Sequence, residues 1–166
     1  MVTVITADLL RLCLDYKENS GKFTWLVRIS TRINIGDEAG CAGDFYWYIR
    51  VHGVLYLAHR LAWLWMTGEW PLGQIGHKDL NKFNNSWSNL RLGTPSQHNA
   101  NKGISTKNKS GIKGVSFDRQ TGKWRSQIQV NGKTLTLGRF EDISAAASAY
   151  RRAAIDHFGE FSNTGE

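Results

Sequence analysis

The sequence has little cysteine and no long apolar segment. Its two cysteines, Cys13 and Cys41, stand far apart and form no C-x-x-C pair, which argues against a disulfide framework and against a zinc finger. No apolar run approaches membrane-spanning length, and the N-terminus lacks the basic, apolar and small-residue regions of a secretory signal. These absences predict a soluble, cytoplasmic protein with no membrane partner.

Acidic residues are scarce in one part of the chain only. Residues 1–100 hold 10 Lys and Arg against 8 Asp and Glu, residues 101–140 hold 9 against Asp118 alone, and residues 141–166 hold 2 against 5. A local basic block of this kind suits a polyanion such as nucleic acid. A solvated basic face is the alternative, and charge alone does not exclude it.

The 166 residues suffice for one medium domain or two small ones, and we expect two. Thr6 can cap a helix that runs to about residue 15. Its apolar positions predict one buried face, made of Leu9, Leu10, Leu12, Cys13 and Leu14. Strand signals follow at residues 23–27, and a hairpin is expected at residues 46–57. Residues 58–67 predict a helix, because they lack Gly and Pro and are followed by Gly68 as a C-cap.

The stretch from 75 to 101 is polar and rich in asparagine. Thr94 and Gln97 form a T-x-x-Q capping box with Pro95 at the first helical position, so a helix should begin there and carry His98. Residues 78–88 form a long polar connection, and long ordered loops are often functional. With short strands at 75–78 and 90–92, the predicted order is strand, loop, strand, helix.

Two histidines and an asparagine in this stretch suggest hydrolytic chemistry. Cleavage of a phosphodiester needs a base to deprotonate water and a cation to stabilise the developing charge. An imidazole supplies the base near neutral pH, so we assign that role to His77 and cation binding to His98. Asn89 could orient His77 by accepting its other ring proton. The alternative is an Asn-rich loop that satisfies only its own backbone.

Residues 111–163 contain three strand signals and a helix. The strands are expected at 114–118, 123–130 and 133–138, and Asn131-Gly132 is a strong two-residue hairpin turn. That turn fixes the register, in which Val130 opposes Lys133 and Ser126 opposes Leu137. The helix starts near Ile143.

The register divides the strand residues between two faces. Trp124, Ile128, Val130, Leu135 and Leu137 share the core face. Lys123, Arg125, Gln127, Gln129, Thr134 and Thr136 share the other. Gln, Arg and Thr can read the edges of adenine, guanine and thymine in a major groove. A solvated polar face, common in antiparallel sheets, is the alternative.

Residues 58–101 contain the runs A-H-R-L-A-W, G-E-W-P, G-H-K-D-L-N-K-F-N-N-S-W-S-N-L-R and S-Q-H-N-A-N. These runs resemble the HNH endonuclease family, in particular its small phage and homing-type members with a ββα-metal site. The resemblance implies that His77 is the general base, that Asn89 orients it and that His98 is the metal ligand on the helix. It also implies a divalent cation as cofactor, Mg²⁺ before Mn²⁺.

One position departs from that family. The residue before the base histidine is usually Asp or His and is a second metal ligand, whereas here it is Gly76. Asp79 is the nearest carboxylate, although on a continued strand it would point to the opposite face. Three outcomes stay open: a weak or substrate-dependent metal site, rescue by Asp79 or a water, and an HNH architecture with impaired cleavage.

The runs K-G-V, K-W-R-S-Q-I-Q, L-G-R-F and A-A-x-A-Y-R-R-A-A lie between residues 111 and 163. They resemble the AP2 DNA-binding domain, which lays a three-stranded sheet in the major groove. The positions that match groove-facing residues are Lys113, Ser116, Gln127, Gln129, Thr134 and Thr136. Lys123, Arg125 and Arg139 are predicted to contact phosphates or base edges.

The sequence therefore predicts an α+β protein with an HNH nuclease domain at residues 1–101, whose ββα core spans about 74–101. A basic linker at 102–110 and an AP2-like domain at 111–163, with a three-stranded antiparallel sheet and a helix, would follow. The predicted function is metal-dependent cleavage of double-stranded DNA by a phage or homing enzyme, with a monomer as the simplest state. A DNA-binding protein that no longer cuts is the chief alternative. An RNA-binding module is weaker, because the sheet face lacks aromatic stacking platforms.

Overall fold

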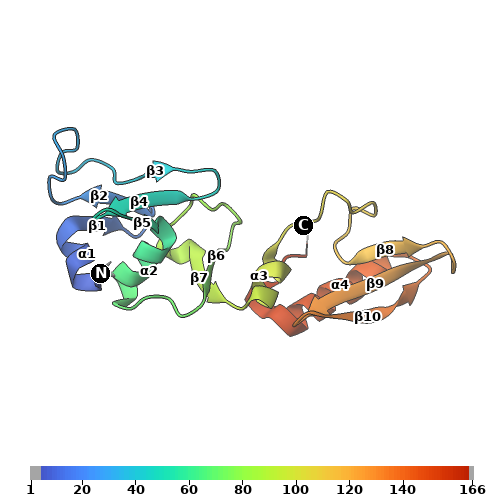
Figure 1. Ribbon diagram of the computed structural model, residues 1–166. Helices are drawn as coiled ribbons and strands as arrows, with labels where there is room; N and C mark the ends of the chain where they lie inside the picture. The colour runs from blue at the N-terminus through green and yellow to red at the C-terminus, as the bar shows by residue number, and fades with distance from the viewer. Residues whose placement is uncertain (1–4, 165–166) are drawn as a thin grey trace. The chain divides into compact units, whose positions relative to one another are not determined.

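The computed structural model describes residues 5–164. The chain divides into two compact units, Met1–Leu92 and Gly93–Glu166 (Figure 1). Among the described residues, four α-helices combine with several small sheets. The predicted α+β class is confirmed at this coarse level. The functional domain limits at 101 and 111 stay predictions, and the compact units part at residue 92.

From residue 5 onward, the first unit contains two α-helices and three small sheets. Its elements are α1 (Ala7–Cys13), β1 (Leu14–Lys17), β2 (Lys22–Trp25), β3 (Cys41–Ala42), β4 (Trp47–Val51), β5 (Val54–Leu57), α2 (Ala58–Thr67), β6 (Gln74–His77), the 3-10 turn η1 (Trp87–Asn89) and β7 (Leu90–Gly93). Strand β1 pairs with β2, the strands β3, β4 and β5 form a second sheet in that order, and β6 pairs with β7.

Helix α1 begins as predicted, since the Thr6 hydroxyl accepts a hydrogen bond from the backbone N of Leu9. It ends at Cys13, two residues earlier than expected, because Leu14 already has the extended backbone of β1. The prediction of a buried Leu12 is wrong: its side chain is 68% exposed. The helix has only seven residues, so its buried face is narrow and excludes Leu12.

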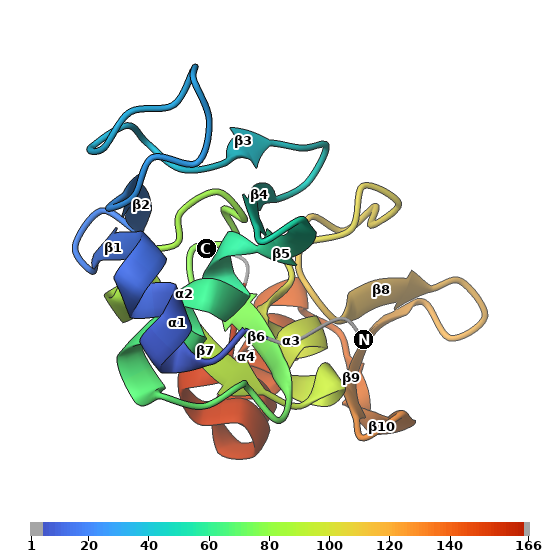
Figure 2. The same ribbon diagram turned by 60° about the vertical axis from the view of Figure 1, so that its left-hand side comes forward.

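Helix α2 has the predicted limits, and Gly68 ends it in the left-handed conformation with φ +82°. Leu61 and Leu64 are fully buried in the core of the first unit together with Phe23 and Ile49. Figure 2 shows α1 and α2 side by side, where they contact each other. The core-facing side of α2 thus fixes the position of its first turn, which carries His59.

The second unit combines a sheet with helices. Its elements are α3 (Pro95–Asn101), β8 (Val115–Asp118), β9 (Lys123–Val130), β10 (Lys133–Phe140), α4 (Ile143–Phe158) and the 3-10 turn η2 (Gly159–Phe161). The sheet has the order β10-β9-β8, and α4 runs along it (Figure 1). Tyr150 of α4 lies so close to Gly114 that a Cβ there would meet the ring at 2.1 Å.

The Asn131-Gly132 turn sets the predicted register at the closed end of the hairpin. Lys133 opposes Val130, and the next three pairs also match the prediction. The predicted pairing of Ser126 with Leu137 is wrong. A register shift between Thr136 and Gly138 places Gly138 opposite Ser126, because a bulge inserts one extra residue into a strand. Arg139 consequently lies opposite Arg125.

Candidate functional site

The polar loop, residues 78–88, connects β6 to η1 and is closed by its own side chains. The backbone N of Lys78 donates to the carbonyl of Asn89 at 2.9 Å. Oδ1 of Asp79 accepts from the backbone N of Asn81 and from Nδ2 of Asn89, both at 2.9 Å, and Oδ2 accepts from Nδ2 of Asn84 at 2.7 Å. Such a network gives a long loop a defined conformation.

His77 ends β6 and is 6% exposed. Its Nε2 lies 3.1 Å from Oδ1 of Asn85, which is itself 2% exposed. Nδ2 of Asn85 faces the carbonyl of Phe83 at 3.4 Å, so the amide oxygen is the atom turned to the ring. An amide oxygen can only accept, and Nε2 must therefore carry the proton. In the neutral ring the basic lone pair is then on Nδ1.

The sequence assigned the orienting role to Asn89, and the structure shows a different partner. The amide of Asn89 accepts from the backbone N of Asp79 at 3.0 Å and donates to Oδ1 of Asp79 and to the carbonyl of Asn84. Asn85 is the side chain that hydrogen-bonds the His77 ring. Asn89 therefore braces the loop, and its effect on His77 is indirect.

Two aromatic rings shield His77. His59, at the start of α2, packs edge-on against it with ring centroids 5.2 Å apart, and Tyr46 lies 5.2 Å from His59 and 6.5 Å from His77. Burial, then the neighbouring His77 and Arg60, lower the pKa of His59 to about 3. Both histidines belong to the first unit.

Burial also lowers the pKa of His77 below its ordinary value of about 6.5, although the hydrogen bond to Asn85 and the nearby Asp79 carboxylate act in the opposite direction. Lys82, whose amine lies 4.9 Å from the centre of the Tyr46 ring, adds to the lowering. His77 is therefore neutral at pH 7. A neutral imidazole of this kind can accept a proton.

Asp79 does not fit the role of a ready metal ligand. The strand ends at His77, so the turn does begin before Asp79, yet the carboxylate turns into the loop and accepts three hydrogen bonds there. Burial alone would raise the pKa of Asp79, but the bonds from Asn84, Asn89 and Asn81 lower it, so the group is an engaged anion. Within residues 5–164, no group of three His, Cys, Asp or Glu side chains is placed to hold a metal.

His98 lies on α3, in the second unit. The predicted capping box is present: the Thr94 hydroxyl accepts from the backbone N of Gln97, and Oε1 of Gln97 accepts from the backbone N of Thr94. The ring of His98 packs against Phe161 with centroids 6.1 Å apart. Its role as a metal ligand stays a prediction.

The outer face of the second unit's sheet carries the predicted polar side chains. Ser116 opposes Arg125 on the neighbouring strand, and Arg139 opposes Arg125 on its other side. Nε2 of Gln127 lies 3.4 Å from the hydroxyl of Thr136, and Gln129 is paired with Thr134. Opposite charges also meet here, since Nε of Arg139 donates to Asp118 at 3.0 Å.

Lys113 does not lie on this face. Its amine donates to the carbonyls of Ala100 and Lys102, both at 2.5 Å, and to the carbonyl of Asn163 at 3.1 Å. An ammonium group has three donors, and all three are used. The prediction that Lys113 contacts DNA is therefore not supported by its position. It instead joins the C-terminal end of α3 to the C-terminal segment of the same unit.

Comparisons with known proteins agree with the motifs. Residues 56–100 match the family model for HNH endonucleases. The chain is 31% identical over 104 residues to Protein 3.8 of Escherichia phage T7, covering 62% of this chain and 85% of that protein. The chain belongs to the HNH endonuclease family. An uncharacterized HNH endonuclease of Acanthamoeba polyphaga mimivirus is 37% identical over 87 residues, which are 52% of this chain and 44% of the viral protein.

The chain also contains an AP2-like region. It is 50% identical over 50 residues, 30% of its length, to APETALA2-like protein 2 of Oryza sativa, where the match covers 12% of the plant protein. The chain thus spans under half of the mimivirus relative and a small part of the plant one. No solved structure matches. Among the described residues, no helix is both long and apolar enough to cross a membrane.

Two residues at the site were missed by sequence reasoning. Asn85 is one of several asparagines in the polar loop, and composition does not say which of them faces His77. His59 contacts the His77 ring through the packing of α2, which local sequence patterns do not show. The only sequence signal for His59 was its position in the first turn of the helix predicted at residues 58–67.

Proposed function

We propose that this protein is a metal-dependent endonuclease that cuts or nicks double-stranded DNA, with His77 as general base. The observation that carries the proposal is the hydrogen bond between His77 and Asn85, which leaves a buried, neutral imidazole with its basic lone pair on Nδ1. A general base must be unprotonated at the working pH and held in one orientation. Both conditions are met at the end of β6.

In this mechanism Nδ1 of His77 removes a proton from the attacking water. The hydroxide oxygen bonds to phosphorus, the bond to the leaving sugar oxygen breaks, and that oxygen takes a proton from solvent. Asn85 stabilises the imidazolium by accepting from Nε2. HNH nucleases use a divalent cation, for which His98 is the proposed ligand. Because Asp79 does not fit as its partner, no step is assigned to the metal.

The outer face of the β8–β10 sheet is the proposed DNA-reading surface. Arg125 and Arg139 face each other across neighbouring strands, and the single carboxylate of Asp118, paired with Arg139, offsets only part of their like-charge repulsion. Nε of Arg125 is buried and has no hydrogen-bond partner among the described residues. A DNA phosphate would relieve the repulsion, while Gln127 and Gln129 would read base edges.

The proposed setting is a bacterial or phage-infected cell, with a phage or homing role, and the relative in Escherichia phage T7 supports the phage part. The direct test incubates the protein with supercoiled plasmid and Mg²⁺, Mn²⁺ or EDTA. Conversion to open-circular or linear DNA in the metal lanes alone is the expected result. A plasmid that stays supercoiled at every protein and metal concentration would contradict the proposal.

Gly76 favours a second candidate, a DNA-binding protein with impaired cleavage. No side chain on β6 stands where the family has a metal ligand, and Asp79 is engaged elsewhere. The variant Gly76→Asp separates the two candidates. A gain in metal-dependent nicking over a weak wild-type rate would show an incomplete metal site. Retained duplex binding with no nicking by either protein would favour the second candidate.

A further inference from the structure

The β1–β2 hairpin holds the polar loop from outside, at the residues around Asn85. The Tyr16 hydroxyl, on β1, donates to the backbone carbonyl of Asn85 at 2.6 Å, and this hydrogen bond is buried. The backbone N of Trp87 donates to the carbonyl of Glu18 at 2.8 Å. The hairpin therefore restrains the loop on both sides of Ser86, next to the side chain that bonds His77.

Gly21 brings the hairpin turn against the same part of the loop. Its φ is +73°, and a Cβ built there would lie 2.2 Å from the carbonyl carbon of Asn85 and 2.3 Å from the backbone N of Ser86. Only glycine permits so close an approach between two backbones. The turn and the loop thus form a tight backbone contact in addition to the two hydrogen bonds.

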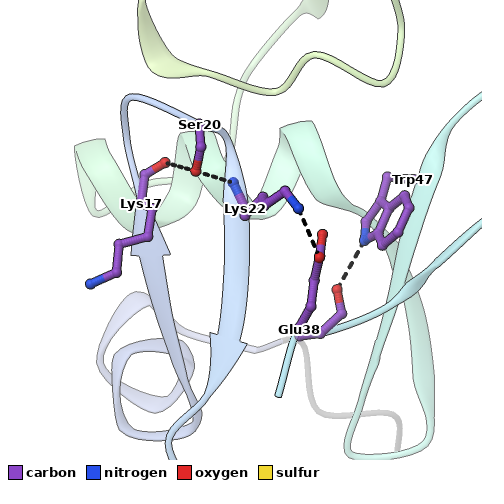
Figure 3. Close-up of polar contacts among 6 residues, drawn as sticks. Lys17, Ser20, Lys22, Glu38 and Trp47 are labelled. Atoms are coloured by element: carbon purple, nitrogen blue, oxygen red, sulfur yellow. Dashed lines mark hydrogen bonds and ion pairs between the residues drawn. The ribbon is translucent and has the colours of Figure 1, made fainter. Parts of the chain in front are cut away.

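The hairpin is itself anchored, as Figure 3 shows. The Ser20 hydroxyl accepts from the backbone N of Lys22 at 3.4 Å, within the turn. The Lys22 amine pairs with Glu38 at 2.9 Å, and Nε1 of Trp47 donates to the carbonyl of Ala39 at 2.9 Å. These contacts link β2 and β4 through residues 38–39. A hairpin that is fixed to neighbouring strands can hold a loop with little regular structure in one position.

We propose that Tyr16 and Asn85 act as positioning residues that set the tautomer and orientation of the His77 ring. Tyr16 fixes the backbone of Asn85, and the Asn85 amide, held by the Phe83 carbonyl, fixes the proton on Nε2. Neither residue touches the substrate in this scheme. The consequence for catalysis rests on the proposed nuclease function, whereas the effect on the ring does not.

The phenol of Tyr16 is suited to this part. Burial, and then the nearby Glu18, raise its pKa above the ordinary value, so it remains a donor at every working pH. Tyr16 also packs in the core, with its ring 4.7 Å from Phe23 and 5.8 Å from Trp65. The variant Tyr16→Phe keeps these ring contacts and removes only the hydroxyl, which separates positioning from packing.

The test is the ¹⁵N NMR spectrum of the His77 imidazole in protein free of metal and DNA, at about pH 7.5. Wild type is expected to show one tautomer, protonated at Nε2. Asn85→Ala should give averaged ring shifts, and Tyr16→Phe a smaller change in the same direction. Tyr48→Phe, which removes a hydroxyl elsewhere in the first unit, is the matched control and should match wild type. Asn85→Asp, which keeps an acceptor oxygen, should keep the proton on Nε2 of His77.

Unchanged His77 shifts in both Asn85→Ala and Tyr16→Phe would overturn the proposal, whether or not the protein cuts DNA. If Asn85→Ala fails to fold, Tyr16→Phe decides alone. In an active enzyme, Tyr16→Phe should lower kcat by about tenfold with little change in KM, since partners that orient a catalytic group typically contribute on that scale. If wild type does not cut plasmid but the His77 ¹⁵N shifts change in the variants, the nuclease function is refuted. The positioning role of Tyr16 and Asn85 is then retained.

Discussion

Asp79 and Asn89 exchange two hydrogen bonds across the neck of the polar loop. The backbone N of Asp79 donates to Oδ1 of Asn89 at 3.0 Å, and Nδ2 of Asn89 donates back to Oδ1 of Asp79 at 2.9 Å. The same Nδ2 donates to the carbonyl of Asn84 at 2.7 Å. Asn89 thus closes the polar loop. Asn85, the residue after Asn84, is the one that hydrogen-bonds His77.

Replacing Asn89 by Ala should destabilise the protein by about 1–3 kcal/mol. The change removes the hydrogen bonds of the Asn89 amide to the backbone N and carboxylate of Asp79 and to the carbonyl of Asn84. Urea unfolding measures this loss. Asn99→Ala, at an exposed position on α3, is the control and should stay within about 0.5 kcal/mol of wild type. Equal stability of the two variants would contradict the bracing role of Asn89.

The shift at His59 predicts a pH dependence of stability. Its folded-state pKa of about 3 lies below the unfolded value of about 6.5, so between these values the unfolded chain binds a proton that the folded chain does not. Stability should be level above about pH 6.5 and fall as the pH drops toward 3, by up to about 1.4 kcal/mol per pH unit for this group.

Urea unfolding of wild type and His59→Phe at pH 7 and pH 5 measures the effect. The variant should lose less stability than wild type between these two pH values. His157→Gln changes an exposed histidine on α4 and should retain the wild-type slope. Parallel slopes for wild type and His59→Phe would mean that His59 is not held neutral by burial.

Lys113 is expected to act on stability and not on DNA contact. Lys113→Met should lower the stability of the second unit by about 1–3 kcal/mol, because three carbonyls lose a charged donor. The dependence of DNA affinity on salt should keep its slope. Arg139→Ala, which removes a proposed phosphate contact, should reduce that slope by about 1. If Lys113→Met reduced the salt dependence of DNA affinity and left the stability of the second unit unchanged, Lys113 would be a DNA contact.

Gln127 is expected to read a base edge. Gln127→Ala should bring the affinities for the preferred site and for altered sites closer together, by about 1–3 kcal/mol for one base pair. Gln120→Ala, in the exposed turn between β8 and β9, should leave the preference intact. Competition binding at one salt concentration measures both. An equal loss of affinity on all sequences would argue against base reading at Gln127.

Local signals predicted the elements around the site well. Gly68 and the run of helix formers before it set the end of α2, and the Thr94–Gln97 capping box set the start of α3. The Asn131-Gly132 turn fixed four cross-strand pairs. Each of these features depends on residues within a few positions of one another, where backbone geometry leaves few alternatives.

Features that depend on packing were missed. No sequence pattern marks the β-bulge near Leu137, which Gly138 allows with its φ of +146°. Which asparagine meets His77 depends on the path of the loop, which turns at Leu80 with φ +65°. The carbonyl cage around Lys113 is made by segments far apart in sequence. Such contacts follow from the tertiary fold and leave little trace in a single sequence.

The role of His77 is tested by comparing single-turnover plasmid cleavage by wild type and His77→Ala at pH 7.5 with Mn²⁺, together with their affinities for uncut duplex. A proton acceptor contributes about 10²–10⁴-fold to such a reaction. We expect a rate loss of that size in His77→Ala with duplex affinity unchanged. Cleavage by His77→Ala at the wild-type rate would contradict it.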